Sequence, residues 1–214
     1  MQAPSTALIR ETFPVGPLQC NCTIIGDPVT GKAIVVDPGG NHQMILDRLE
    51  ALGLKVVSII HTHAHLDHFL ASGEMKKATG ATLHLHKEDQ FLWDNLEMQC
   101  NMFGIPYTPV PAPDQWLQDD EELACGCGVA MHTPGHTPGS MSFWFPRDKL
   151  LIAGDTLFRG GIGRTDLWGG DSKAIEQSIR GRLYNLDEEA VVVTGHGPDT
   201  RIGDEMRANP FVRA

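Results

Sequence analysis

One stretch of the sequence concentrates residue types that bind metal ions. It reads His61-Thr62-His63-Ala64-His65-Leu66-Asp67-His68. It directly follows the β-branched apolar run 56–60, which predicts a buried strand that ends where the histidines begin. In an extended segment, side chains two positions apart lie on the same side, so His63 and His65 can bind one ion. Asp67 and His68 follow on a turning backbone and can reach a second ion nearby. The stretch therefore predicts a dinuclear metal site.

The second half of the chain repeats one pattern three times. An apolar strand runs into a small residue and then into a ligand-type side chain, which is His136, Asp155 or His196. A metal site built at the end of a sheet requires this arrangement. His61 differs, because it lies one step inside the predicted strand end. We expect it to be a packed or supporting histidine rather than a ligand.

Apolar runs and helical periodicity predict the elements that position these residues. Strands are expected at 23–25, 33–37, 56–60, 81–85, 128–132, 140–145, 149–153 and 190–193. Helices are expected after an N-terminal cap at Asn41, over 69–78 and 87–98, and after a cap at Asp171. Residues 100–120 contain several prolines and predict a connecting loop, a lid or a pocket wall. No linker divides the chain, so residues 1–214 are predicted to form one domain with a layered sheet core.

Composition narrows the class of protein. The chain has 214 residues, 41% of them hydrophobic, and a formal net charge of −10. An acidic chain is a poor partner for nucleic acid, so we expect a small-molecule substrate. No apolar run approaches the ~20 residues of a membrane span and no signal peptide is evident, which predicts no membrane partner and a cytoplasmic location. The five cysteines favour free thiols over thiolate metal ligands, because the His and Asp set already suffices. The sequence does not determine the oligomeric state.

The motifs resemble those of the metallo-β-lactamase fold superfamily. Its Thr-His-x-His-x-Asp-His signature matches residues 62–68, and the settings of His136, Asp155 and His196 match its remaining ligand positions in order. The resemblance extends from about residue 20 to the end of the chain. It implies an α/β fold, a four-layer αββα sandwich with mixed sheets and metals at one edge of the two sheets.

The resemblance also implies a division of the ligands. One ion is expected on His63, His65 and His136, the other on Asp67, His68 and His196, with Asp155 bridging the two. Two divalent ions, zinc first and iron or manganese as alternatives, can share a hydroxide formed from a water with a pKa of about 7. We expect Asp67 also to be catalytic, by orienting that nucleophile. Hydrolysis of a carbonyl compound is the natural reaction.

Residues 154–166 resemble the glyoxalase II branch, whose members are thioesterases that hydrolyse S-lactoylglutathione. Two features depart from it: only eighteen residues follow His196, and Arg164 and Asp166 stand where that branch has lysine and tyrosine. The chain is therefore most similar to short bacterial glyoxalase II-like hydrolases. We expect Arg164 to bind a substrate carboxylate, or else to form a structural ion pair with Asp166 or Asp171.

Other reactions remain open at this level. Persulfide dioxygenases share an Arg-Gly-x-Gly-Arg-Thr-Asp segment that resembles residues 159–166, but they use one iron held by two histidines and one aspartate. A lactonase or a β-lactamase-type hydrolase would use the same metal site. A purely binding role is disfavoured, because no ligand position has been lost. Of these, the sequence favours a dinuclear thioester hydrolase.

Overall fold

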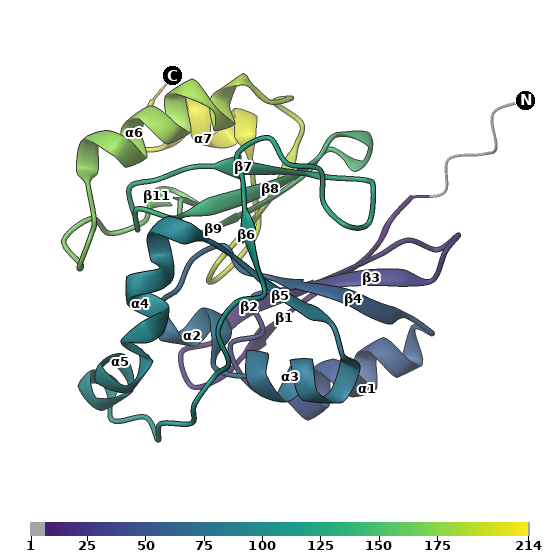
Figure 1. Cartoon of the computed structure of the whole chain (residues 1–214). Helices are drawn as coiled ribbons and strands as arrows, with labels where there is room; N and C mark the ends of the chain where they lie inside the picture. The colour runs from purple at the N-terminus through teal and green to yellow at the C-terminus, as the bar shows by residue number, and fades with distance from the viewer. Residues whose placement is uncertain (1–6, 214) are drawn as a thin grey trace, which may run out of the picture.

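Two β-sheets face each other, and helices cover the outer face of each (Figure 1). The computed structural model describes residues 7–213. The first sheet has the order β1-β2-β3-β4-β5-β6, with strands Ile9–Val15, Cys20–Gly26, Lys32–Val36, Lys55–Ile60, Thr82–His86 and Gln115–Leu117. The second has the order β13-β12-β9-β8-β7, with strands Thr200–Arg201, Val191–Thr194, Leu150–Gly154, Met141–Phe145 and Val129–His132. A small ribbon pairs β10 (Leu157–Phe158) with β11 (Gly161–Ile162).

Both sheets are mixed. In the first sheet, β1, β2 and β3 are antiparallel, whereas β3, β4, β5 and β6 are parallel. In the second sheet, β9 and β12 are parallel and the other pairs are antiparallel. Because parallel neighbours end at the same edge, residues that follow β4, β9 and β12 can converge there.

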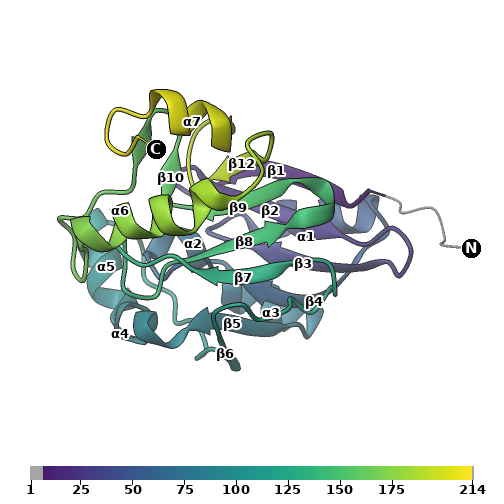
Figure 2. The ribbon, with the colours of Figure 1, turned by 90° about the horizontal axis from the view of Figure 1, so that it is seen from above.

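The helices complete the four layers. They are α1 (His42–Ala51), α2 (Leu66–Phe69), α3 (Ser72–Thr79), α4 (Gln90–Asp94), α5 (Leu96–Phe103), α6 (Ser172–Gly181) and α7 (Ile202–Ala208). Helices α1 and α3 lie outside the first sheet, and α6 and α7 lie outside the second (Figures 1 and 2). The predicted αββα sandwich with mixed sheets is therefore confirmed. None of the helices described here has the length and hydropathy of a transmembrane span.

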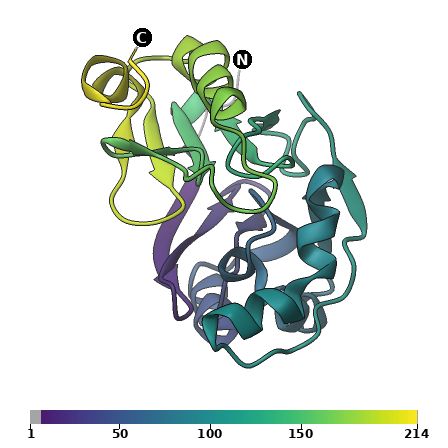
Figure 3. The ribbon, with the colours of Figure 1, turned by 90° about the vertical axis from the view of Figure 1, so that its left-hand side faces the viewer.

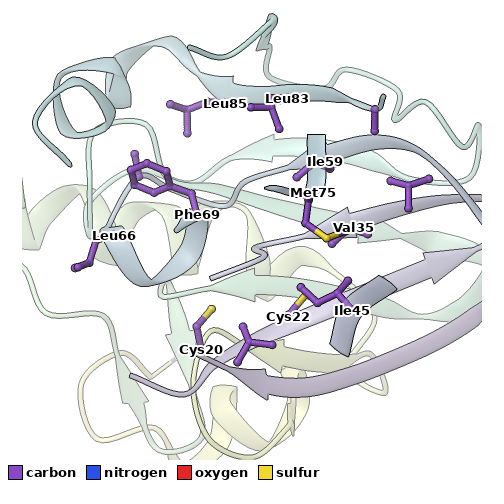
Figure 4. Close-up of a cluster of buried hydrophobic side chains, with 14 of the residues drawn as sticks. Cys20, Cys22, Val35, Ile45, Ile59, Leu66, Phe69, Met75, Leu83 and Leu85 are labelled. Atoms are coloured by element: carbon purple, nitrogen blue, oxygen red, sulfur yellow. The ribbon is translucent and has the colours of Figure 1, made fainter. Parts of the chain in front are cut away.

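Three hydrophobic clusters separate the four layers. The first cluster joins α1 and α3 to the first sheet through Ile45, Met75 and Val35 (Figure 4). The second fills the space between the sheets, and the third packs α6 and α7 on the second sheet. Ile34 belongs to the second cluster and its neighbour Val35 to the first. Because successive strand residues face opposite sides, a strand covered on both faces needs the continuous apolar run that its sequence shows.

Several local predictions need correction. Asn41 has a left-handed backbone, and its side chain accepts a hydrogen bond from the Gly16 amide instead of capping α1. The helix predicted over 69–78 begins only at Ser72, as α3, because the short helix α2 ends at Phe69. The helix predicted over 87–98 is a 3₁₀ turn followed by α4 and α5, and α5 continues to Phe103. By contrast, the Asp171 side chain accepts from the amides of Lys173 and Ala174, as expected for the N-terminal cap of α6.

Candidate metal centre

The seven predicted ligands lie together at one edge of the sandwich. His63 and His65 follow β4, and Asp67 and His68 lie in α2. The β7–β8 loop supplies His136, while Asp155 and His196 follow the parallel neighbours β9 and β12. Hydrogen bonds between the two sheets fix this edge: the Met141 amide donates to the Thr62 carbonyl, and the Asn21 amide to the Gly195 carbonyl, both at 2.7 Å.

The ligand atoms form three overlapping groups. In each group the atoms lie within 4.8 Å of one another: His63, His65 and His136; Asp67, His68 and His196; and His63, His68 and Asp155. The carboxylate of Asp155 lies between the first two groups. Its Oδ1 is 3.5 Å from His68 Nε2, and its Oδ2 is 3.6 Å from His136 Nε2 and 3.9 Å from His196 Nε2. The grouping is compatible with the division of ligands that the resemblance implies, which stays a prediction.

Hydrogen bonds behind the site fix the tautomers of two histidines. The Thr62 hydroxyl donates to Asp37 Oδ2 at 2.6 Å, so its oxygen is free to accept from His63 Nδ1 at 3.0 Å. His68 Nδ1 donates to the same Asp37 oxygen at 2.9 Å. Both rings therefore carry their proton on Nδ1 and direct the lone pair of Nε2 into the cluster, which is how supporting carboxylates orient ligand histidines.

His136 is oriented in the same way, because its Nδ1 donates to the Arg164 carbonyl at 2.8 Å. Three buried atoms in the cluster have no hydrogen-bond partner: His63 Nε2, His68 Nε2 and Asp155 Oδ1. Leaving buried polar atoms unpaired is costly, and a cation bound among them would satisfy all three. The residues present therefore fit a metal site.

Burial favours the neutral form of three imidazoles of the cluster, and the neutral form is the one that binds a metal ion. Burial lowers the pKa of His63 well below the usual value, with neighbouring histidines adding to the effect. Burial also lowers the pKa of His65 to about 3 and lowers that of His136. Burial alone would raise the pKa of Asp67, but the effects of His68 and His196 are larger together and hold this pKa below its usual value. At neutral pH the centre thus offers an ionised Asp67 and neutral imidazoles on His63, His65 and His136, which are the forms that bind metals. Burial also acts on His68 and His196, but neighbouring anionic groups outweigh it and raise their pKa, so a metal ion would have to displace a proton there.

Two nearby residues have side chains of a ligand type but interact with other protein groups. Both ring nitrogens of His61 are hydrogen-bonded, one to the His84 carbonyl and one to the Ser72 hydroxyl, each at 2.7 Å. Cys20 Sγ lies 3.4 Å from His68 Nδ1, on the side of the ring away from the cluster, and burial raises the pKa of its thiol to about 12. His61 is a packed histidine, as predicted, and a protonated Cys20 supports His68 rather than binding a metal.

Close packing explains why a glycine precedes two of the predicted ligands, Asp155 and His196. Gly154 has a φ of 50°, and a side chain there would collide with Thr62. A side chain at Gly195 would collide with the carboxylate of Asp155. Only glycine allows two strand ends to approach this closely.

Sequence reasoning missed two carboxylates that hold the site. Asp37 follows the apolar strand β3, so the pattern that identified Asp155 could have identified it. Asp89 lies in a charged 3₁₀ turn, and nothing in its sequence surroundings indicates its role. Its two oxygens accept hydrogen bonds from the amides of Ala64 and Gly139 and from the Thr137 hydroxyl, which joins the two loops that carry His63, His65 and His136.

A cavity of about 480 Å³ opens above the cluster. His65, Asp67, His136, Asp155 and His196 form its floor, and α5 forms one wall. In Figure 3, α4 and α5 are the teal helices in the lower right of the view. Met102 and Phe103 belong to that wall, so the beginning of the 100–120 segment is helical and lines the pocket.

Arg164 is one of the residues that line this cavity. Its guanidinium donates to both carboxylate oxygens of Asp166, at 2.8 and 2.9 Å, and both side chains are exposed. One of the two ion pairs expected for Arg164 is therefore present, and a substrate carboxylate would have to compete with Asp166.

Comparisons with known proteins agree with this architecture. The family model of the metallo-beta-lactamase superfamily matches residues 15–196. The chain therefore belongs to the metallo-beta-lactamase superfamily, a superfamily of metallo-hydrolases.

Among its relatives, the chain is 38% identical to hydroxyacylglutathione hydrolase GloC of Haemophilus influenzae, over 95% of this chain and 98% of the other. Among solved structures, it is similar to the BLEG-1 B3 metallo-beta-lactamase, with a TM-score of 0.89, 33% identity, and coverage of 96% and 100%. It is also similar to TTHA1623 in a di-iron-bound form, with a TM-score of 0.88, 34% identity, and coverage of 94% and 100%.

Proposed function

We propose that the protein is a dinuclear metal-dependent thioesterase that hydrolyses S-lactoylglutathione or a related thioester. One observation carries the proposal. Seven His and Asp side chains converge on one cluster, and three of their buried polar atoms lack any protein partner. The similarity to a hydroxyacylglutathione hydrolase along nearly the whole chain supports the choice of substrate class.

His63, His65 and His136 would hold one ion, and Asp67, His68 and His196 the other, with Asp155 between them. Two divalent ions held there would supply Lewis-acid polarisation of the substrate carbonyl and a hydroxide nucleophile at neutral pH. We propose zinc as the metal. Histidine and carboxylate ligands also accept iron, and a di-iron form of a similar structure makes iron the first alternative.

The protein's own residues position the reactants. Asp67 Oδ2 lies 3.1 Å from His196 Nε2 and borders the cavity, so its carboxylate can accept a hydrogen bond from the attacking nucleophile and fix its direction. Asp37 and Thr62 hold two ligand imidazoles from behind, which limits rearrangement of the site during the reaction. The apolar side chains that line the cavity would contact the bound thioester and reduce its exposure to water.

A mononuclear dioxygenase would need only two histidines and one aspartate. The donors for a second ion are complete here, because Asp67, His68 and His196 form their own group within 4.8 Å. This favours hydrolysis over oxygen chemistry.

The decisive experiment measures two reactions on the same metal-loaded protein: release of thiol from S-lactoylglutathione and other thioesters, and oxygen uptake with a persulfide. We expect thiol release without oxygen uptake. Asp67→Asn should lower kcat at least ~100-fold. Asp47→Asn, at an exposed position of α1, is the matched control and should leave kcat unchanged. Oxygen uptake without thioester hydrolysis would overturn the proposal.

A further inference from the structure

Exposed apolar side chains gather around one cavity. In the part of the chain that the structure describes, seven large apolar side chains are exposed, and four of them line the cavity above the cluster. They are Met98, Met102, Phe103 and Trp168, with 42, 72, 54 and 52% of their surface exposed. Exposing this much apolar surface in one place is unfavourable unless it binds something.

The two sides of the cavity are held in place from behind. The Trp168 ring packs edge-on against Phe91 of α4, with the ring centroids 4.8 Å apart. Met98, Met102 and Phe103 lie on α5, the helix that follows α4. The rings of Phe103 and Trp168 provide large apolar surfaces, and the unbranched methionines can adapt to ligands of different shape.

Two polar side chains of the walls, Gln99 and Arg164, form hydrogen bonds within the protein. Apart from the predicted metal ligands, the polar groups of the lining are the side chains of Gln99 and Arg164 and the indole N–H of Trp168. Gln99 accepts from the Leu66 amide and donates to the carbonyls of Ala64 and Leu92, at 2.9, 3.1 and 2.8 Å. Arg164 is paired in bidentate fashion with Asp166. The Gln99 amide is therefore fully hydrogen-bonded and the Arg164 charge is balanced by Asp166, so α5 and Trp168 present mainly apolar surface to the cavity.

We infer that this cavity binds an apolar alkyl or aryl group of the substrate, so that the preferred substrate is an apolar thioester rather than a glutathione thioester. This inference rests on the proposed thioesterase function, and it deepens it by naming the substrate class.

The chemistry of the two candidates differs sharply. A glutathionyl group carries two carboxylates, one ammonium and two peptide groups, and burying any of them without a partner is costly. An apolar chain needs no partner, and each buried methylene strengthens binding about fourfold. Because the predicted ligands form the floor of the cavity, an apolar group held between α5 and Trp168 would place the adjoining carbonyl next to them.

The first test is a series of N-acetylcysteamine thioesters with acetyl, butanoyl and hexanoyl groups, assayed on the metal-loaded protein. A second series keeps the acetyl group and lengthens an alkyl thiol. We expect kcat/KM to rise by about fourfold per methylene in one of the two series, until the cavity is filled, and to exceed the value for S-lactoylglutathione. The series that rises identifies which half of the substrate the cavity holds. Flat values in both series, or a preference for S-lactoylglutathione, would overturn the inference.

Variants locate the effect. Phe103→Ser and Met102→Ser remove exposed apolar surface from the wall and should flatten the dependence of kcat/KM on chain length. Phe211→Ser is the matched control, because Phe211 is 66% exposed and does not line the cavity. An equal loss in the Phe211 variant would contradict a role for the cavity wall.

A binding measurement separates this inference from the proposed reaction. Calorimetry with non-hydrolysable hexyl and methyl thioethers of N-acetylcysteamine requires no turnover. Tighter binding of the hexyl compound, lost in Phe103→Ser, supports the apolar cavity even if no thioester is hydrolysed, and the thioesterase proposal alone then fails. Hydrolysis of S-lactoylglutathione together with equal binding of the two thioethers overturns the cavity inference and leaves the thioesterase proposal intact.

Discussion

Asp89 accepts the backbone N–H of Ala64 at 2.9 Å, between the predicted ligands His63 and His65. The same carboxylate accepts the Thr137 hydroxyl at 2.7 Å and the Gly139 amide at 2.6 Å, beyond His136. One buried side chain thus sets the spacing of the two loops that would hold the first ion. Burial raises its pKa from 3.8 to about 6, although these hydrogen bonds act in the opposite direction.

The raised pKa of Asp89 makes stability depend on pH. Between about pH 4 and 6 the folded protein holds this proton and the unfolded chain releases it, so the free energy of unfolding falls as pH rises. The stabilisation is complete below pH 4, and its loss above pH 6 amounts to roughly 3 kcal/mol. Asp89→Asn cannot titrate, so it should lack this component. Urea unfolding of the metal-free proteins from pH 4.5 to 7.5 measures the difference; parallel curves for the two proteins would refute the prediction.

Asp37→Asn should weaken metal binding by about 10- to 100-fold. One oxygen of the Asp37 carboxylate accepts hydrogen bonds from His68 Nδ1 and the Thr62 hydroxyl. The other oxygen accepts a hydrogen bond from the Thr62 amide. An asparagine amide at this position makes His68 less basic. It also has only one oxygen, so its NH2 group would face one of the donors, such as the Thr62 N–H. Competition with a metal-sensing dye measures the affinity, and Asp47→Asn is the control. Unchanged affinity would mean that Asp37 has no part in orienting His68.

The purified protein should bind close to two metal ions. Asp155→Ala should lower the occupancy of both, because its two oxygens face both ligand groups. Elemental analysis during metal titration gives the stoichiometry. Saturation at a single iron, together with full activity of His196→Ala, would favour the dioxygenase instead.

Removal of metal should destabilise the fold. Without cations, the carboxylates of Asp67 and Asp155 repel each other and three buried polar atoms of the cluster stay unpaired. The free energy of metal binding, which stabilises the folded state, is also lost. We expect a chelator to lower Tm by roughly 5–10 °C. Asp155→Asn removes one of the charges, so the shift should be smaller in that variant. An identical Tm with and without chelator would speak against a metal centre of this kind.

Asp166→Asn tests whether Arg164 can recognise an anion. Removing the charge of Asp166 frees the guanidinium at the rim of the cavity. KM for S-lactoylglutathione should then fall roughly threefold with little change in kcat, and KM for a neutral thioester should stay constant. Arg164→Ala should raise KM for S-lactoylglutathione only slightly, because Asp166 already occupies the guanidinium. Equal changes on both substrates would instead indicate a structural role for the ion pair.

The sequence by itself determined which residues could form the site. The cluster from His63 to His68, and the strand, glycine and ligand pattern before Asp155 and His196, are local features, because strand ends and turn residues are set by nearby side chains. The same local rules located most strands and the cap of α6 at Asp171.

Tertiary structure decided what surrounds those residues. Asp89 lies 25 positions from Ala64 and 48 from Thr137, so no local pattern could show that it joins their loops. The pairing of Arg164 with Asp166 and the apolar wall formed by α5 and Trp168 likewise depend on how chain segments pack. Local chemistry identifies candidate ligands, whereas the supporting carboxylates and the character of the cavity arise only when distant segments meet.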